Sequence, residues 1–282
     1  MLSIIKYQLR NRRNAFLLKG GILLGLHLVV WTLEAREILA GTYSLTPSAG
    51  FWLFVTGVYT VLLTIATFLT CASGHASDLL YKDTGYLMLA VPRRGWQILG
   101  GRFVAGFVEF FAYALLALAC VFIHAAMVIT LKSAGTAGFG ESLRFVASRV
   151  FGANLAALGK FLLILLSAYA SLGMSLTFAF VLSRSFVRNR ALSIAGAAAV
   201  FVVLVNATTF LGSALALRLD WSLTFPFSVW AGPPGGSPFA QPEALPIIQT
   251  LVVPVAPFLL YPVLALALLS AASWLMEKKV EL

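Results

Sequence analysis

Charged side chains are scarce in this sequence, and their scarcity decides the broad class of the protein. Of the 282 residues, only 11% are charged and 60% are hydrophobic, and the mean hydropathy is +0.94. A soluble domain carries roughly 25% charged residues. So few charges cannot coat a soluble globule of this length, and we therefore expect lipid to solvate much of the surface.

Motifs of catalysis and of metal binding are also missing. The sequence contains no G-x-x-x-x-G-K-[ST] loop, no H-E-x-x-H and no C-x-x-C, so we predict no catalytic residue, no cofactor and no metal on this chain. The only two cysteines, Cys71 and Cys120, lie in or at the ends of apolar runs, which argues against a disulfide framework. His75 and Asp78 follow Cys71, but their spacing as metal ligands is generic.

Six apolar stretches are long enough to cross a bilayer, which takes roughly 20 residues. They lie at 15–33, 50–72, 103–131, 154–182, 191–217 and 249–275. No soluble domain interrupts them. The sequence therefore predicts an all-α integral membrane protein, with six transmembrane helices in a single domain over residues 1–282.

The distribution of basic residues predicts the orientation of the spans. With the N-terminus inside, 14 of the 20 Lys and Arg residues fall in cytoplasmic segments, as the positive-inside rule requires. Both termini are then cytoplasmic, and we expect a multi-pass protein of the bacterial inner membrane. The net charge of +10 does not indicate nucleic acid, because the basic residues form short clusters between apolar runs.

Two segments outside these spans have a pattern of their own. In residues 1–14, Leu2, Ile5 and Leu9 recur at helical spacing opposite basic residues, which favours an interfacial helix against anionic membrane lipid over an ordinary charged flank. Residues 218–248 are apolar but contain six prolines, so they cannot form a continuous span. We interpret them as a candidate re-entrant outer segment.

The cytoplasmic loop 73–102 carries the most informative pattern. Residues 78–102 read DLLYKDTGYLMLAVPRRGWQILGGR. Gly85 frees the backbone between two short helices, and Leu87 and Leu89 are apolar in a segment that should be wet. Such side chains favour a protein partner, although they could instead lie on the bilayer.

This loop resembles the one between the second and third spans of permease subunits of type-2 ABC exporters. The matching residues are Asp83, Thr84, Gly85, Tyr86, Leu87, Leu89, Pro92, Arg93, Arg94, Ile98, Leu99, Gly101 and Arg102, and Trp96 lies among them. Arg102 stands where the family commonly has Lys. The resemblance implies a coupling helix that docks on a separate P-loop ATPase subunit, where ATP and Mg bind. It also implies a second permease subunit, identical or a sibling, with spans two and five at the seam.

Polar residues inside the spans are candidates to line a path or the seam, because burying them is costly. They are Glu109, Asn206 and Thr209. Glu109 is otherwise a carboxylate paired with a nearby base, and the other two otherwise serve helix packing. Two further functions stay open, a secondary transporter and a non-transporting membrane assembly or scaffold protein, and only the permease requires a bound ATPase.

Overall fold

Helices make up most of the described chain. The computed structural model describes residues 1–43, 47–81, 94–133, 138–148, 155–219, 221–229 and 247–278. The elements are α1 (Leu2–Leu39), α2 (Pro47–Ala72), α3 (Ala76–Tyr81), α5 (Gly95–Lys132), α6 (Phe139–Ala147), α7 (Leu155–Phe186), α8 (Arg190–Arg218), β1 (Ser222–Val229), β2 (Ile247–Pro254) and α9 (Ala256–Lys278). Six helices, α1, α2, α5, α7, α8 and α9, are long and apolar enough to cross a membrane, which confirms the predicted number of candidate spans.

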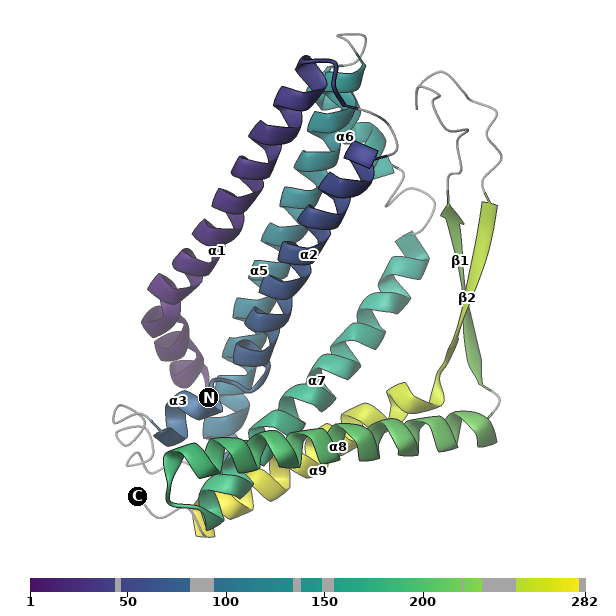
Figure 1. The fold of residues 1–282 in the computed structure, drawn as a ribbon. Coiled ribbons are helices and arrows are strands. Elements are labelled where there is room, and N and C mark those ends of the chain that lie inside the picture. Colours follow the sequence, from purple (N-terminus) through teal and green to yellow (C-terminus); the bar gives the residue numbers. More distant parts are fainter. Residues whose placement is uncertain are drawn as a thin grey trace.

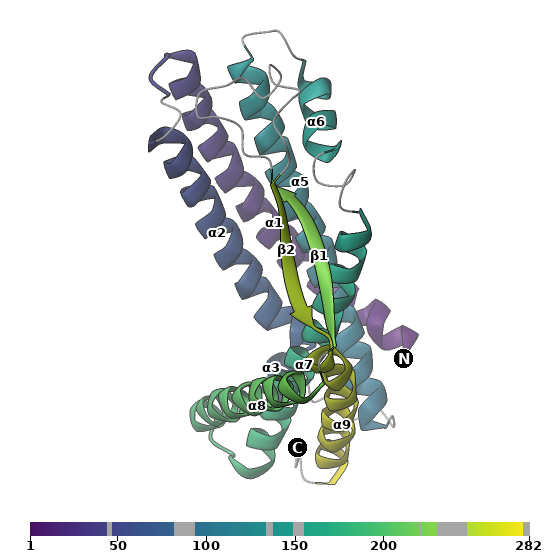
Figure 2. The same cartoon turned by 90° about the vertical axis from the view of Figure 1, so that its right-hand side faces the viewer.

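Helices α1 and α5 extend beyond the spans that hydropathy predicts. Each has 38 residues, or about 57 Å of helix, which exceeds the roughly 30 Å hydrocarbon core of a bilayer. Residues 2–14, expected as an interfacial helix, are the first turns of α1, and Figure 2 shows these turns bending away from the rest of that helix. The charged N-terminal segment is therefore continuous with the first candidate span.

A ribbon of two antiparallel strands precedes α9, and the sequence interpretation contained no strand. Strands β1 and β2 pair from Ser222 opposite Pro254 to Val229 opposite Ile247. Both are rich in the β-branched and aromatic residues that favour strands, and each is an edge strand, where proline is tolerated. The last span, expected from residue 249, therefore begins only at Ala256. Of the expected re-entrant segment 218–248, residue 220 and residues 230–246 lie outside the described residues.

The long helices form two groups that diverge from one end of the molecule (Figure 1). Helices α1, α2 and α5 run alongside one another, and α7, α8 and α9 form the second group. In Figure 1, α8 and α9 run across the direction of α1, α2 and α5, and α7 is the member of the second group that lies beside α2 and α5. The six candidate spans therefore do not share one direction in the isolated chain.

The two groups meet in a hydrophobic cluster beside α3. Its buried members come from α3, the first turns of α5, α7 and the end of α9: Leu79, Leu80, Ile98, Leu99, Val181, Ala272, Leu275 and Met276. Ile4, near the start of α1, packs against the same cluster. Residues near both ends of the described chain thus lie at the end of the molecule from which the helices diverge.

Glycines allow helix backbones to touch where α2 ends. A side chain at Gly106 of α5 would collide with the carbonyl of Cys71, and one at Gly173 of α7 would collide with the carbonyl of Ala72. In contrast, Gly21 of α1 has nothing within 4 Å of the position of an added Cβ. The contacts of α2 with α5 and α7 therefore depend on particular glycines.

We predict that Gly106→Ala destabilises the protein and that Gly21→Ala does not. Inserting a methyl group against a backbone carbonyl forces the helices apart, at a cost of about 1–3 kcal/mol, whereas the same change at Gly21 meets open space. Thermal unfolding in mild detergent measures the difference. Equal unfolding midpoints for the two variants would contradict the close approach of α2 and α5.

Candidate functional site

Glu109 lies at the centre of a buried network of ion pairs. Its carboxylate lies 3.3 Å from Nε of Arg12, 3.3 Å from Nζ of Lys19 and 2.9 Å from Nε2 of His75, and only 4% of its side chain is exposed. The sequence left open whether Glu109 is paired or lines a path. In the structure the carboxylate is paired with three groups, which is how a buried carboxylate stays ionised at acceptable cost.

Three separate parts of the chain supply this network. Arg12 and Lys19 lie seven residues apart on α1, so they project from one face of the helix. His75 comes from the turn between α2 and α3. Asp78, on α3, extends the network because its carboxylate accepts a 2.7 Å hydrogen bond from Nη1 of Arg12. The network thus joins α1 and α5 to the segment that leads into residues 82–93.

The turn at residues 73–75 has an unusual backbone that Arg102 stabilises. Gly74 has φ +57°, and a Cβ there would lie 2.8 Å from the backbone nitrogen of Phe103. His75 has φ +55° and is the only non-glycine residue with positive φ among the described residues, a conformation that costs a side chain energy. The Arg102 guanidinium donates to the carbonyls of Gly74 (3.1 Å) and His75 (2.8 Å). Arg102, matched on the sequence to a motif position, therefore braces this turn.

Burial lowers the pKa of His75 below its ordinary value of 6.5. The imidazole is therefore neutral at pH 7. Because an ionised carboxylate can only accept a hydrogen bond, Nε2 of His75 carries the proton and donates it to Glu109. The histidine thus supports the carboxylate as a neutral donor, while Arg12 and Lys19 supply the positive charge.

Cys71, His75 and Glu109 bring together three atoms of metal-ligating type. One such atom from each residue lies within 4.8 Å of the others, and all three residues are buried. A sulfur, an imidazole and a carboxylate are a donor set that zinc accepts. However, Arg12 and Lys19 contact the same carboxylate, and their charges oppose a further cation there. We therefore assign His75 and Glu109 to the ion-pair network and Cys71 to its buried surroundings.

A second polar cluster lies at the far end of the same helix group. Glu34 of α1 accepts hydrogen bonds from Nε2 of His124 (2.6 Å) and from the hydroxyl of Tyr43 (3.0 Å). Burial and the hydrogen bond to Glu34 raise the pKa of Tyr43 above its ordinary value, so Tyr43 remains a donor. His27, in the interior between the clusters, lies 3.4 Å from the hydroxyl of Thr60.

A packed layer separates the two polar clusters. It consists of Leu23 of α1 with Tyr113, Ala117 and Cys120 of α5, all of them buried. Within the described residues, a buried hydrophobic cluster thus lies between the two polar ends of the α1–α2–α5 group.

Most of the predicted coupling residues lie outside the described residues. These are Asp83, Thr84, Gly85, Tyr86, Leu87, Leu89, Pro92 and Arg93. Arg94 is the N-cap residue of α5, and Trp96 in its first turn is 45% exposed.

Both flanks of the segment 82–93 are attached to the second helix group. On the α3 side, the hydroxyl of Tyr81 lies 2.6 Å from that of Ser193 on α8. On the α5 side, the backbone N–H of Gly95 donates to Glu277 of α9 over 2.6 Å. A displacement of the loop would therefore act on α8 and α9 as well as on α5.

Asn206 and Thr209 both lie on exposed positions of α8. Each donates to the carbonyl four residues earlier in its own helix, Val202 and Val205 respectively. Thr209 also lines a cavity of about 260 Å³, together with residues of α7 and Tyr261 of α9. Asn206 does not line this cavity, so the structure does not bring the two predicted residues into one site with Glu109.

Sequence reasoning missed the partners of Glu109. On the sequence, Arg12 and Lys19 indicate only the orientation of the spans. A usable signal was present, because each lies at the edge of an apolar run, where an unpaired charge is expensive. Which of these charges meet depends on how the helices pack.

Comparison with known proteins returned no match: no protein-family model, no curated protein and no solved structure is similar to this chain.

We predict that Arg12 and Glu109 are energetically coupled. Glu109→Gln leaves two cations without their carboxylate, and Arg12→Gln removes one of those cations, so the double variant should lose less stability than the sum of the single variants. The expected interaction energy is about 1–3 kcal/mol. Unfolding by SDS in mixed micelles measures the four forms. The control is a second cycle that combines Glu109→Gln with Arg10→Gln, at an exposed position of α1. The effects of these two variants on stability should be additive.

Stability should fall as the pH drops below about 6.5, the ordinary pKa of histidine. The folded-state pKa of His75 lies below the unfolded value of 6.5, so the unfolded chain binds more protons in this window and is favoured. The variant His75→Asn should flatten the dependence of stability on pH in this range. Asparagine is chosen because it tolerates positive φ. An unchanged slope in the variant would show that His75 is not the titrating group.

Proposed function

We propose that this chain is the membrane-spanning permease subunit of an ATP-driven exporter of the type-2 ABC class. In this proposal it forms part of the substrate path and couples to a separate P-loop ATPase, which binds ATP and Mg. The chain itself then hydrolyses nothing. The observation that carries the proposal is the motif at 83–102. Tyr81 and Gly95, on either side of segment 82–93, both hydrogen-bond to the second helix group.

The contacts of those flanks give the loop a mechanical connection to both helix groups. A coupling element must pass a displacement to the spans as a rigid-body movement. Here α3 and the start of α5 share a hydrophobic cluster with α7 and α9. On the other side, Asp78 and Glu109 connect the same region to α1 through Arg12. A push from an ATPase on 82–93 would thus reach α1, α7 and α9 together.

The resemblance implies a second permease subunit, and the exposure of α2 and α8 is compatible with one. In the apolar 18-residue stretch of each helix, only 6% of the residues of α8 and 17% of those of α2 are buried. In the proposal these two helices face the partner subunit or lipid, and both termini lie in the cytoplasm of a bacterium. Because α8 and α9 run across α1, α2 and α5 in the isolated chain, the proposal requires them to turn toward a common direction in the assembled transporter.

A proton-coupled secondary transporter is the second candidate, and one observation favours it. Ionisable groups occupy both ends of the α1–α2–α5 group, with Glu109 at one end and Glu34 beside His124 at the other. Such a transporter usually places its ion sites near the midplane, on broken helices. The residues between the clusters, Leu23, Tyr113, Ala117 and Cys120, instead form a buried hydrophobic cluster, so the permease remains the better supported function.

The proposal predicts a partner that depends on the loop. When the chain is purified from its native host in mild detergent, a P-loop ATPase should co-purify with it at about one copy per permease. Leu87→Asp with Leu89→Asp should remove that ATPase, because charged side chains cannot enter an apolar groove without partners. Co-purification followed by mass spectrometry measures the ratio.

The matched control is Phe186→Asp, which alters an exposed apolar side chain beside the connection between α7 and α8 and should leave the ATPase bound. Full ATPase yield with the double variant would make the coupling assignment wrong. A clean preparation without any ATPase would favour the secondary transporter, and proton flux through a Glu109→Gln variant would then be the next measurement.

A further inference from the structure

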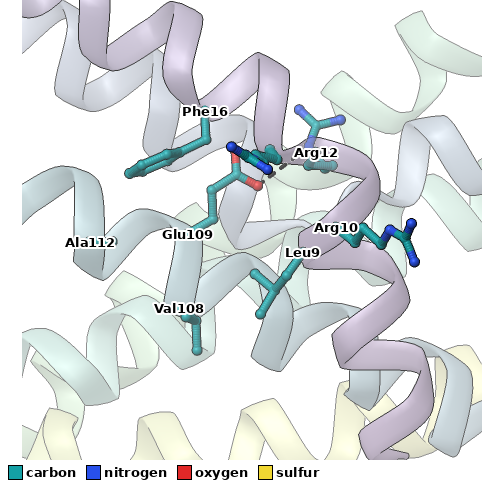
Figure 3. Close-up of a pocket in the computed structure, with 8 residues that line it drawn as sticks. Leu9, Arg10, Arg12, Phe16, Val108, Glu109 and Ala112 are labelled. Carbon is teal, nitrogen blue, oxygen red and sulfur yellow. Dashed lines mark ion pairs between the residues drawn. The ribbon is translucent and has the colours of Figure 1, made fainter.

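A pocket of about 260 Å³ opens between α1 and α5, beside Glu109 (Figure 3). Its lining is divided by chemistry. One part is basic and contains Arg10, Arg12 and Arg13 of α1. The other part is apolar, with Leu9 and Phe16 from α1 and Val108 and Ala112 from α5. A ligand that fills it should combine an anionic group with hydrocarbon.

The basic part contains more positive side chains than the nearby acidic side chains pair with. Glu109 is the only acidic residue in the lining, and Arg12 and Lys19 already pair with it. Arg12 also pairs with Asp78. Among the described residues neither Arg10 nor Arg13 forms an ion pair, and both are exposed. Figure 3 shows Arg10 extending away from Glu109. These two guanidinium groups are therefore available to an anion at the rim.

The pocket lies where the charged ends of both helices give way to apolar residues. On α1 no Asp, Glu, Lys or Arg occurs between Lys19 and Glu34, and on α5 none occurs between Glu109 and Lys132. Apolar stretches of this kind lie in the hydrocarbon core, and the charges before them lie at the level of the lipid head groups. The basic rim is therefore at head-group level, and the apolar part of the pocket adjoins the acyl chains.

We propose that this pocket binds an anionic phospholipid. Arg10 and Arg13 hold its phosphate by charge-assisted hydrogen bonds, which are stronger than those of neutral pairs. The upper part of one acyl chain lies along Phe16, Val108 and Ala112. Pockets for whole drug-sized ligands measure about 300–1,000 Å³, so a smaller cavity suits part of a lipid whose remaining chain stays in the bilayer. This site concerns lipid alone and does not depend on an ATPase partner.

Lipid retention by the full chain tests the site. The protein is reconstituted in nanodiscs of phosphatidylglycerol and phosphatidylcholine in equal amounts, and native mass spectrometry of the released chain counts each retained lipid. The unsubstituted chain should retain phosphatidylglycerol preferentially. Arg10→Gln with Arg13→Gln should lower that preference about 25-fold, taking about fivefold for each basic residue near an anionic surface. Arg190→Gln with Arg218→Gln removes the same charge from exposed positions outside the pocket and outside residues 1–14 and should leave the preference in place.

A second pair of variants tests the apolar part without changing charge. Ala112→Trp fills the pocket, and Ala119→Trp places the same side chain two turns along α5, at an exposed position outside it. Only the first should reduce the retention of phosphatidylglycerol, and by at least fivefold. Both side chains replace exposed alanines, so folding should survive in both.

Four results would overturn the proposal. Three come from the retention measurements: equal retention of the two lipids by the unsubstituted chain, an equal loss in the charge-matched control, and unchanged retention in Ala112→Trp. The fourth concerns phosphate. An excess of inorganic phosphate should fail to displace the lipid, because phosphate alone makes no contact with the apolar part. Full displacement by phosphate would show that the pocket is a simple anion site and that the lipid proposal is wrong.

Discussion

The cost of keeping the Glu109 carboxylate ionised inside an apolar helix group is the constraint on which the rest of the structure depends. A buried carboxylate needs opposite charge and hydrogen-bond donors within reach, and α5 alone cannot supply them. Arg12 and Lys19 must come from α1, and His75 must come from the turn after α2. Satisfying one charge therefore sets how three helix segments lie against one another.

That arrangement has consequences on both sides of the network. Toward residues 82–93, Arg102 braces the turn that carries His75, and the flanks of this segment join the cluster that connects the two helix groups. Toward lipid, Arg10 and Arg13, which do not pair within the network, lie at the rim of the α1–α5 pocket. The proposed coupling site and the proposed lipid site thus adjoin the same ion pairs. In these proposals, a lipid bound at the rim and a movement of the loop would both displace the first turns of α1.

Several features could be predicted because they follow from local composition. The six candidate spans appear as apolar runs, since a helix in lipid must present apolar side chains along its whole length. Their ends could not be predicted well, because helix continues into charged sequence, as residues 2–14 do in α1. The ribbon of β1 and β2 was missed because prolines at 218–248 were taken only as breakers of a span, although an edge strand tolerates them.

By itself, the sequence determined that the chain needs a membrane, where its apolar runs lie and which loop carries a recognisable motif. These are properties of neighbouring residues, and burial in lipid acts on them locally. Only the tertiary structure decided that residues 12, 19, 75 and 109 meet and that Arg10 and Arg13 do not join them. Charges far apart in the chain have no fixed partner until packing brings them within a few ångströms, because electrostatic attraction between groups in water is weak at longer range.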